Sequence, residues 1–396
     1  MGVRIVILGG SFGGLTCAFD LRRQLGKKAE ISVVCDLDSF IFIPSLPWVS
    51  MGYRSPADIT LPLQRILGSK GIDFIHEEAT GVDPKSSEVI TAARKIRYDY
   101  LIIATGPALA FSAVSGLGPE KGYTECIFTL EQAVRCREAW KRFLEDPGPI
   151  VIGSVQGVSC FGPTYEYAFE VAAELKKRKI RHKVPITLVT SEPYIGHFGI
   201  GGLGKSRRIM EDEFAEREIR VITNMAVDEF TPDEVRLNDG TKLPFKLSMF
   251  APPMTGVPAV SHLGNPKGFI PVDDNYRHRD FRNIFSVGVA VAMAPSEKTP
   301  VPTGLPKTGF MTVKMARDAA RTITADILGK EPPETEPVDV LCLMDMGDTA
   351  AFMKAKPVLP PRQESTLKAG KQYKWMKAGF EKYYLWKIKH GLTQLP

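Results

Sequence analysis

The sequence lacks several features that would define its class at once. It contains no run of about 18 or more apolar residues, which excludes an ordinary membrane-spanning helix. Its six cysteines form no C-x-x-C pair, which argues against a zinc ribbon or a thioredoxin-type motif, and we expect no metal site. The chain has almost no net charge outside the C-terminal region, where residues 368–390 carry seven lysines and one glutamate, an excess equal to the net charge of +6. A nearly neutral body of this kind argues against a nucleic-acid-binding domain.

The composition is that of a globular protein. At 396 residues, with 44% hydrophobic and 24% charged residues, the chain is long enough for two or three domains with their own cores. A predicted strand begins within a few residues of Met1, so we expect no secretory signal peptide. We therefore expect a location in the cytoplasm or on the cytoplasmic face of a membrane, where disulfides are more often catalytic than structural.

The N-terminal segment predicts a dinucleotide-binding βαβ unit. A strand at Arg4–Leu8 precedes a glycine-rich turn, a helix over about 14–25 and a second strand at Glu30–Cys35. Such a turn lets the backbone approach a pyrophosphate at the helix N-terminus, and Asp36 stands where an acid binds an adenosine ribose. A serine occupies the middle glycine position of the usual motif. The predicted pyrophosphate contacts are Gly9, Ser11, Phe12, Gly13 and Gly14.

Two later segments are expected to return to the same nucleotide. One predicted strand runs into Ala104-Thr105-Gly106-Pro107, and another, over 282–290, contains Gly288-Val289. A loop with Lys307 and Gly309 then begins a predicted helix over about 310–328. Backbone donors and a lysine at a helix N-terminus favour an anionic ligand.

A second strand-turn-helix unit carries a cysteine where a nicotinamide nucleotide would be expected. The strand at Pro149–Ile152 is followed by a turn over 153–160 that ends at Cys160, and a helix is predicted at Tyr165–Lys177. A thiol near a helix N-terminus gains thiolate character, which would make it a nucleophile. The alternative is a buried structural cysteine. Cys342 lies in a short predicted strand, and spacing alone does not pair it with Cys160.

Four segments in order resemble sulfide:quinone oxidoreductases, and the similarity is closest to bacterial membrane-associated members. The segments are Gly157–Ala168, Ser191–His197, Pro302–Gly309 and Cys342–Asp348. The resemblance implies FAD as cofactor and Cys160 with Cys342 as the redox pair. Sulfide would attack the bridged pair, one cysteine would become a persulfide, and Cys342 would add to the flavin. Electrons would pass to a membrane quinone, and the sulfur would leave as polysulfide or elemental sulfur.

The same resemblance implies further site residues and exposes two departures. A third family cysteine aligns with Phe128 and a family histidine with Gln132, so either Cys126 substitutes or the protein works with two cysteines. Glu166 and His197 are candidate proton carriers, although Glu166 has the alternative of stabilising its own helix. Lys307 would stabilise the anionic reduced flavin.

The C-terminal segment combines aromatic residues with lysines. Met376, Phe380, Tyr383 and Tyr384 share one predicted helical face, and lysines are expected on the rest of the helix. Such a helix suits the headgroup region of an anionic membrane, and its alternative is docking on the protein's own core. By resemblance Phe380 would stack on the quinone, with Pro44 from an apolar loop beside it.

These observations predict an α/β fold with two tandem Rossmann-like dinucleotide-binding domains and a C-terminal amphipathic helical membrane-binding segment. Residues 1–109 and 251–330 would form the FAD-binding domain, 110–250 the second Rossmann-like domain, and 331–396 the quinone- and membrane-anchoring region. The expected function is sulfide:quinone oxidoreductase, on the inner-membrane surface of a bacterium. Type II NADH:quinone oxidoreductase, a flavocytochrome sulfide dehydrogenase subunit and a non-catalytic flavin-binding redox sensor are the alternatives. Oligomeric state stays open.

Overall fold

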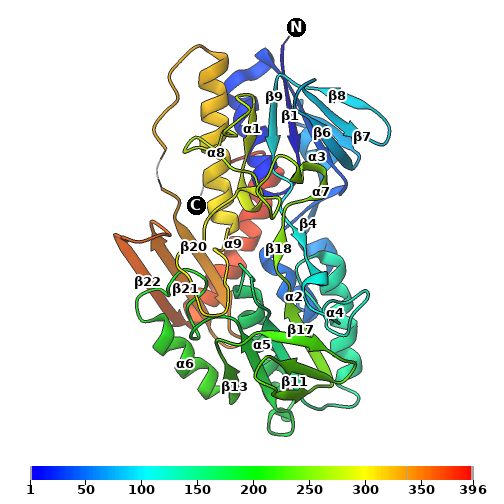
Figure 1. Ribbon diagram of the computed structural model, residues 1–396, viewed down its shortest axis with the longest axis vertical. Coiled ribbons are helices and arrows are strands. Elements are labelled where there is room, and N and C mark those ends of the chain that lie inside the picture. Colours follow the sequence, from blue (N-terminus) through cyan, green and yellow to red (C-terminus); the bar gives the residue numbers. More distant parts are fainter. Residues whose placement is uncertain (1, 336, 394–396) are drawn as a thin grey trace.

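The N-terminal unit is a five-stranded sheet in the upper half of the molecule (Figure 1). The computed structural model describes residues 2–335 and 337–393. The parallel strands follow the order β19-β9-β1-β2-β5. Strand β1 reads as a continuous apolar run because its residues 5–8 are all buried, as expected for a central parallel strand. The strands are β1 Val3–Leu8, β2 Ala29–Cys35, β5 Asp73–His76, β9 Tyr100–Ile103 and β19 Ile284–Ser286.

Two helices pack against each other beside this sheet. Helix α1 (Phe12–Leu25) follows the glycine turn, and α8 (Gly309–Ile327) packs along it. The turn must contain glycine because a Cβ on Gly14 would lie 1.8 Å from the carbonyl oxygen of Gly9. The predicted return of the chain to the first sheet is therefore confirmed by β19 and α8, which place residues near 290–310 against the N-terminus of α1.

A second parallel sheet forms the lower half of the molecule (Figure 1). Its strand order is β13-β12-β11-β17, and helix α5 (Gly162–Lys177) follows β11. The sequence also predicts a strand at Ile186–Thr190, and β12 has these bounds in the structure. The strands are β11 Ile150–Ser154, β12 Ile186–Thr190, β13 Ile219–Ile222 and β17 Leu247–Ala251.

The C-terminal region begins with an antiparallel sheet, of which only the first strand was predicted. Strand β20 (Val340–Asp345) pairs with β21 (Ala350–Lys356), which pairs with β22 (Glu364–Gly370). Strand β20 packs against α5 and against α9 (Lys371–Lys389), so this sheet joins the second unit to the C-terminal helix. The sequence also predicts a linker over 330–337. Residue 336 of this linker and residues 394–396 of the C-terminal region lie outside the described residues.

The remaining elements are short connections and meanders. They are β3 Ser39–Ile41, α2 Leu46–Ser50, β4 Thr60–Pro62, α3 Leu63–Gly68, β6 Ala79–Asp83, β7 Glu88–Thr91, β8 Lys95–Arg97, β10 Ala108–Leu109, α4 Leu130–Phe143, α6 Ser206–Glu216, β14 Val227–Phe230, β15 Glu234–Leu237, β16 Lys242–Pro244, β18 Met254–Thr255 and α7 Pro258–Ser261. Short 3-10 turns include Ile43–Ser45 and Gly288–Ala290.

Helix α9 packs with one face against the C-terminal sheet and leaves its other face exposed. The predicted apolar face divides, because Tyr384 is buried in the core while Met376 and Tyr383 are 46% and 39% exposed. The expectation that lysines lie on the outside is wrong for Lys377 and Lys387, which are both buried. Those two positions face the protein because α9 is docked; Lys377 pairs with buried Glu166, and the charge of Asp20 favours the charged form of Lys387.

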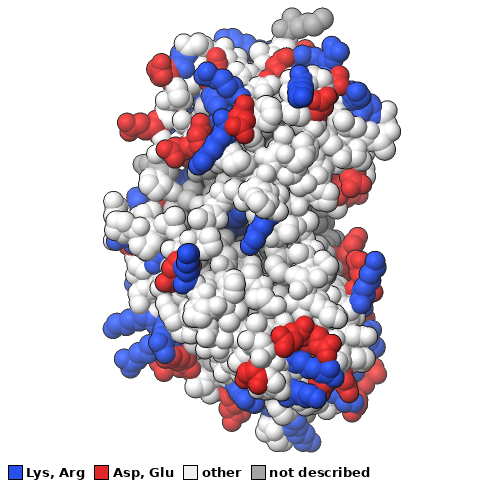
Figure 2. Space-filling view, in the orientation of Figure 1, with Lys and Arg blue, Asp and Glu red and all other residues white. Residues whose placement is uncertain are grey.

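The exposed surface carries both signs of charge. On the face seen in Figure 2, acidic and basic side chains gather toward the two ends of the molecule and leave much of the middle uncharged. Among residues 2–335 and 337–393, no helix is both long and apolar enough to cross a bilayer.

Candidate active site

The glycine turn at the start of α1 fits a pyrophosphate. Gly9 has a φ of +106°, and a Cβ there would lie 2.4 Å from the carbonyl oxygen of Ala104. Ser11 caps α1 without a side-chain hydrogen bond, so its hydroxyl does not occupy the first-turn N–H groups, which have no partner inside the helix. A Cβ on Gly13 would come within 3.0 Å of Val287. These close approaches leave open backbone donors, which is the requirement for a bound dinucleotide.

The other predicted contacts lie at the same edge of the first sheet. Asp36 follows β2 with an exposed side chain, as a ribose ligand requires. Thr105 and Gly106 follow β9, on the other side of β1, and Gly106 has a φ of +69°. Pro107 is half-buried next to them. The carboxyl ends of parallel strands are where such folds bind nucleotides.

Lys307 braces the backbone at the end of β19. Its Nζ donates to the carbonyl oxygens of Val289 at 2.8 Å and Val291 at 2.6 Å. Burial lowers the pKa of Lys307 to about 8. Gly288 has a φ of +72°, and Gly309 packs against the ring of Phe12. The lysine therefore lies between the β19 turn and the start of α8, where the resemblance implies the flavin, and these residues fit FAD.

The turn that carries Cys160 contacts the segment leading to Lys307. The N–H of Gly157 donates to the carbonyl oxygen of Pro302 at 2.6 Å, and that of Gly304 donates to Val158 at 2.8 Å. A Cβ on Gly304 would lie 2.7 Å from Ser159, the residue before Cys160. The second dinucleotide-like turn is thus packed against the first unit at the edge where the flavin is expected.

Cys160 and Cys342 come together across the contact between α5 and β20. Both are thiols in this structure and both are partly exposed. Burial raises the pKa of Cys160 to about 11. Burial raises the pKa of Cys342 to about 12, and the charge of nearby Cys160 raises it as well. The N–H of Leu343 lowers this pKa by a smaller amount. The two sulfur atoms are therefore electrostatic neighbours, although their residues are far apart in sequence.

The predicted thiolate character of Cys160 is wrong for this state. Cys160 lies two residues before the first residue of α5, outside the first turn in which a helix dipole acts. Burial disfavours the charged form and no opposite charge compensates, so the pKa rises instead of falling. Both members of the pair are neutral thiols at neutral pH.

Cys126 is buried in the core, away from the exposed pair. Burial raises its pKa to about 12. Its charge contributes to the raised pKa of Cys136, so Cys136 is its neighbouring sulfur. Gln132, at the family histidine position, caps α4 by accepting from the N–H groups of Phe128 and Thr129. The sequence left open whether Cys126 substitutes for the third family cysteine or the protein works with two cysteines. The buried position of Cys126 favours two cysteines.

Glu166 forms a buried ion pair with Lys377 of α9. The lysine also lies over the ring of Trp48, with Nζ 4.6 Å from its centroid. Burial lowers the pKa of Lys377 to about 7, while the charge of Glu381 raises it and that of Arg54 lowers it further. The pair joins α5 to α9, and Lys377 is a group in it whose protonation changes near neutral pH.

His197 is fully buried in a glycine-rich loop. Its Nδ1 accepts from the N–H of Gly199 at 3.1 Å, so Nε2 carries the proton of the neutral ring and donates to Glu297 at 2.7 Å. The loop touches the Cys160 segment, because a Cβ on Gly199 would lie 3.2 Å from the ring of Phe161. The structure thus places His197 next to the redox-cysteine turn with one defined tautomer.

Glu192, the acid that follows strand β12 of the second unit, points inward. Glu192 follows β12 by two residues, near the position where a nicotinamide-binding domain would use an acid for ribose. Here its side chain is fully buried and accepts from Tyr165, Thr190 and the N–H of Phe198. The carboxylate is therefore not available to a ribose.

Phe380 and Pro44 lie on neighbouring segments. The ring of Phe380 is 6.0 Å from that of Phe42, and Pro44 is exposed two residues later. Tyr384 contacts Phe42 and also Phe12, at centroid distances of 5.5 and 5.0 Å. An aromatic cluster thus connects α9 to the start of α1, on the side where the quinone was predicted.

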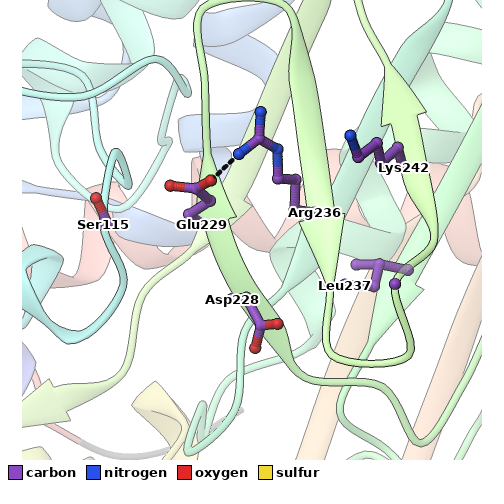
Figure 3. A pocket seen from close by; sticks show the side chains of 7 residues that line it. Ser115, Asp228, Glu229, Arg236, Leu237 and Lys242 are labelled. Atoms are coloured by element: carbon purple, nitrogen blue, oxygen red, sulfur yellow. Dashed lines mark hydrogen bonds and ion pairs between the residues drawn. The ribbon is translucent and has the colours of Figure 1, made fainter.

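A shallow cavity of about 320 Å³ lies elsewhere, over β14–β16 (Figure 3). Glu229 and Arg236 form an ion pair across it, and Ser115, Asp228 and Lys242 complete the polar lining. No predicted site residue lines this cavity, and two of its four charged side chains, Glu229 and Arg236, neutralise one another.

Three functional neighbours were not predicted from the sequence: Lys377, Glu297 and Glu192. Glu192 belonged to a segment singled out by resemblance, and its position after a strand was a usable signal. Lys377 was assigned to the helix exterior, since its partner Glu166 is 211 residues away. Glu297 lies in an irregular loop whose pairing no local pattern indicates.

Comparisons with known proteins agree with this geometry. Residues 3–320 match the family model described as pyridine nucleotide-disulphide oxidoreductase. The chain is 43% identical to a sulfide-quinone reductase of Aquifex aeolicus over 99% of this chain and 92% of that protein. The crystal structure of the sulfide:quinone oxidoreductase from Aquifex aeolicus superposes with a TM-score of 0.95 at 41% identity, covering 99% of this chain and 92% of that one.

A type II NADH:quinone oxidoreductase of Staphylococcus aureus is 23% identical over 97% of this chain and 96% of its own length. The sulfide-quinone reductases to which this chain is related are FAD-binding flavoproteins, and the glycine turn of α1 fits this cofactor. The chain belongs to the pyridine nucleotide-disulphide oxidoreductase family and, within it, to the sulfide-quinone reductases.

Proposed function

We propose that this protein oxidises sulfide at the Cys160–Cys342 pair and passes two electrons through FAD to a membrane quinone. The observation that carries the proposal is the juxtaposition of the two cysteines where the second dinucleotide unit meets the FAD side of the molecule. A cysteine pair at this position supplies electrons from sulfur, in the place where a reductase would receive them from NADH.

The cysteines alternate between a bridged and an open state in this proposal. Hydrosulfide attacks one sulfur of the bridged pair, the S–S bond breaks, and one cysteine carries the added sulfur as a persulfide while the other leaves as a thiolate. FAD, when bound, would supply the two-electron acceptor: the thiolate and the persulfide would lose two electrons and one proton and re-form a sulfur bridge that is longer by one sulfur. Repeated turnover would release this sulfur as polysulfide or elemental sulfur. Quinone then takes these two electrons with two protons and becomes the quinol. Glu166 with Lys377 is placed to move a proton between the two sides of the site.

His197 and Lys307 have separate tasks. His197 lies beside the Cys160 turn and donates from Nε2 to Glu297, and we assign to this pair the proton of hydrogen sulfide or of the persulfide. Lys307, bound to two carbonyl oxygens at the end of β19, supplies positive charge at the edge expected for the flavin. Cys126 has no assigned step.

The NADH alternative has less support. Its cofactor requires an available acid after the second strand, and Glu192 is buried with its oxygens engaged. The turn after β11 offers Gly153 and Gly157 but ends in Cys160, for which an NADH enzyme would have no use. A redox sensor that holds FAD without turnover is the other alternative, and cysteine variants separate it from an enzyme.

We further propose that the exposed aromatic side chains of α9 contact the membrane. Trp375 is 80% and Trp386 51% exposed, and exposed Ile43 lies beside the predicted quinone residue Pro44. Exposed lysines on α9 supply attraction to anionic headgroups. In this proposal the domains extend over 1–109 with 251–330, 110–250 and 331–396, and the last anchors the quinone side.

Replacing either redox cysteine tests the proposed function. In C160A and in C342A, sulfide should reduce the flavin at a rate lower by roughly a thousandfold or more, because the bridged pair cannot form. Anaerobic absorbance measurements on rapid mixing give this rate. Quinone should still reoxidise flavin that dithionite has reduced. C136A, which changes a buried cysteine outside the site, is the control and should keep the sulfide reaction. Normal rates in C160A and C342A would refute the role of the pair.

The raised pKa of Cys160 predicts slow alkylation at neutral pH. In C342A after reduction, the reaction of Cys160 with iodoacetamide should accelerate about tenfold per pH unit and level off only near its pKa of about 11. The reaction is followed by mass spectrometry of the peptide that contains Cys160. A plateau near neutral pH would show that the helix dipole outweighs burial after all.

Membrane contact predicts that exposed tryptophans contribute to vesicle binding. The variant W375A/W386A should bind phosphatidylglycerol vesicles roughly tenfold more weakly in sedimentation, because two apolar interfacial side chains are lost. Y123A removes an aromatic side chain that is 50% exposed on another part of the chain and should bind as the unchanged protein does. Equal binding of all three proteins would place the membrane surface elsewhere.

A further inference from the structure

Glu192 is a fully buried carboxylate to which the proposed reaction assigns no task. Its Oε2 accepts from the hydroxyl groups of Tyr165 and Thr190, each at 2.8 Å. Its Oε1 accepts from the N–H of Phe198 at 2.6 Å. One backbone N–H and two hydroxyl groups face the carboxylate, and its ionised form can accept from all three at once.

Two of these donors lead to the residues on either side of His197. The hydroxyl oxygen of Tyr165, which donates to Glu192, accepts from the N–H of Gly196 at 2.8 Å. Phe198 donates to Glu192 directly. The backbone before and after His197 is therefore tied to one carboxylate.

The loop needs this restraint because its backbone is strained. Phe198 has a φ of +56°, in the left-handed region that a bulky side chain seldom adopts. Such a conformation persists only where surrounding bonds fix it. The next N–H, that of Gly199, is the donor that sets the tautomer of His197. A change at Phe198 would thus alter the imidazole directly.

The same carboxylate also reaches the redox cysteine. Tyr165 lies on α5, five residues after Cys160, and its ring is 5.1 Å from that of Phe198. Glu192 therefore joins the helix that follows Cys160 to the loop that carries His197. In a nicotinamide-binding relative, the acid at this position would bind ribose, whereas here Glu192 connects α5 to the loop.

We propose that Glu192 is a positioning residue of the sulfide-oxidising site, whose ionised carboxylate holds His197 against the Cys160 turn. This inference rests on the proposed function. A protonated Glu192 accepts more weakly from Tyr165 and Phe198, because bonds to an ionised carboxylate are the stronger ones. The tie is therefore strongest while Glu192 is charged.

The surroundings of Glu192 place this transition near neutral pH. Burial raises its pKa to about 7, against lowering by the bonds from Phe198, Tyr165 and Thr190. The titratable groups that its charge reaches are Tyr165 on α5 and Tyr194 in the loop, and Arg207 of α6 lies over the ring of Tyr194. As pH falls through about 7, Glu192 takes up a proton and the restraint on His197 weakens.

The test compares the holoenzyme with E192Q and Y165F. On anaerobic mixing with sulfide, the flavin reduction rate of the unchanged enzyme should fall as pH decreases through about 7. E192Q should react roughly tenfold or more slowly and lack this step, because the amide cannot accept from all three donors. Y165F, which removes the bond to Glu192 and the bond from Gly196 but leaves those from Thr190 and Phe198, should lie between them. Reoxidation of dithionite-reduced flavin by quinone should be unchanged in both variants.

E170Q is the matched control. Glu170 is also a fully buried glutamate, on α5, but its carboxylate makes no hydrogen bond among the described residues. E170Q should keep the pH step near 7. If E192Q reacts at the unchanged rate with the step retained, or if E170Q loses the step as well, Glu192 does not position the site.

A second readout separates this inference from the proposed function. Nitrogen-15 NMR of the His197 ring should show one tautomer in the unchanged protein above pH 7 and a mixture in E192Q. If sulfide fails to reduce the flavin of the unchanged enzyme, the proposed function fails while the NMR comparison still decides the restraint. Identical ring signals in the two proteins would refute it.

Discussion

The packing of β20 against α5 is the contact on which the rest of the structure depends. It carries Cys342 from the C-terminal sheet to Cys160 at the end of the second dinucleotide-like turn. The same turn is bonded to residues 302 and 304, which lead to Lys307 and α8. One set of contacts therefore brings a sulfur pair to the edge at which the first unit is built to hold FAD.

Buried charges fix this arrangement in several directions. Glu166 and Lys377 connect α5 to α9, while Asp345 at the end of β20 accepts from the indole N–H of Trp48 at 2.8 Å. Glu192 makes the corresponding connection between α5 and the His197 loop. Breaking a buried pair leaves an uncompensated charge, so each connection selects one geometry strongly even where its net contribution to stability is small. The site is accordingly specified by polar bonds between elements distant in sequence.

Much of the fold could be predicted from local patterns. Both βαβ units, strand β12, helix α8 and helix α9 followed from apolar runs, glycine turns and periodicity. Strands β21 and β22 were missed, since their alternation is short and mixed with lysines and small residues. The cysteine pair came from family resemblance, because spacing alone did not join Cys160 to Cys342.

The errors share one cause, which is burial decided by tertiary structure. Lys377 and Lys387 have the sequence character of surface residues, yet α9 is docked so that both face inward. Cys160 has a helix to its C-terminal side, yet desolvation outweighs the dipole. The role of Glu192 depends on three donors from separate elements, which no local pattern contains.

The most direct test of the account is an anaerobic titration of the purified yellow protein, first with sulfide, then in a separate sample with NADH, followed by a soluble quinone. The account predicts that sulfide bleaches the flavin, that NADH does not, and that quinone restores the colour. Bleaching by NADH alone would contradict it, reassign the second unit as a nicotinamide site and leave the two cysteines as structural residues.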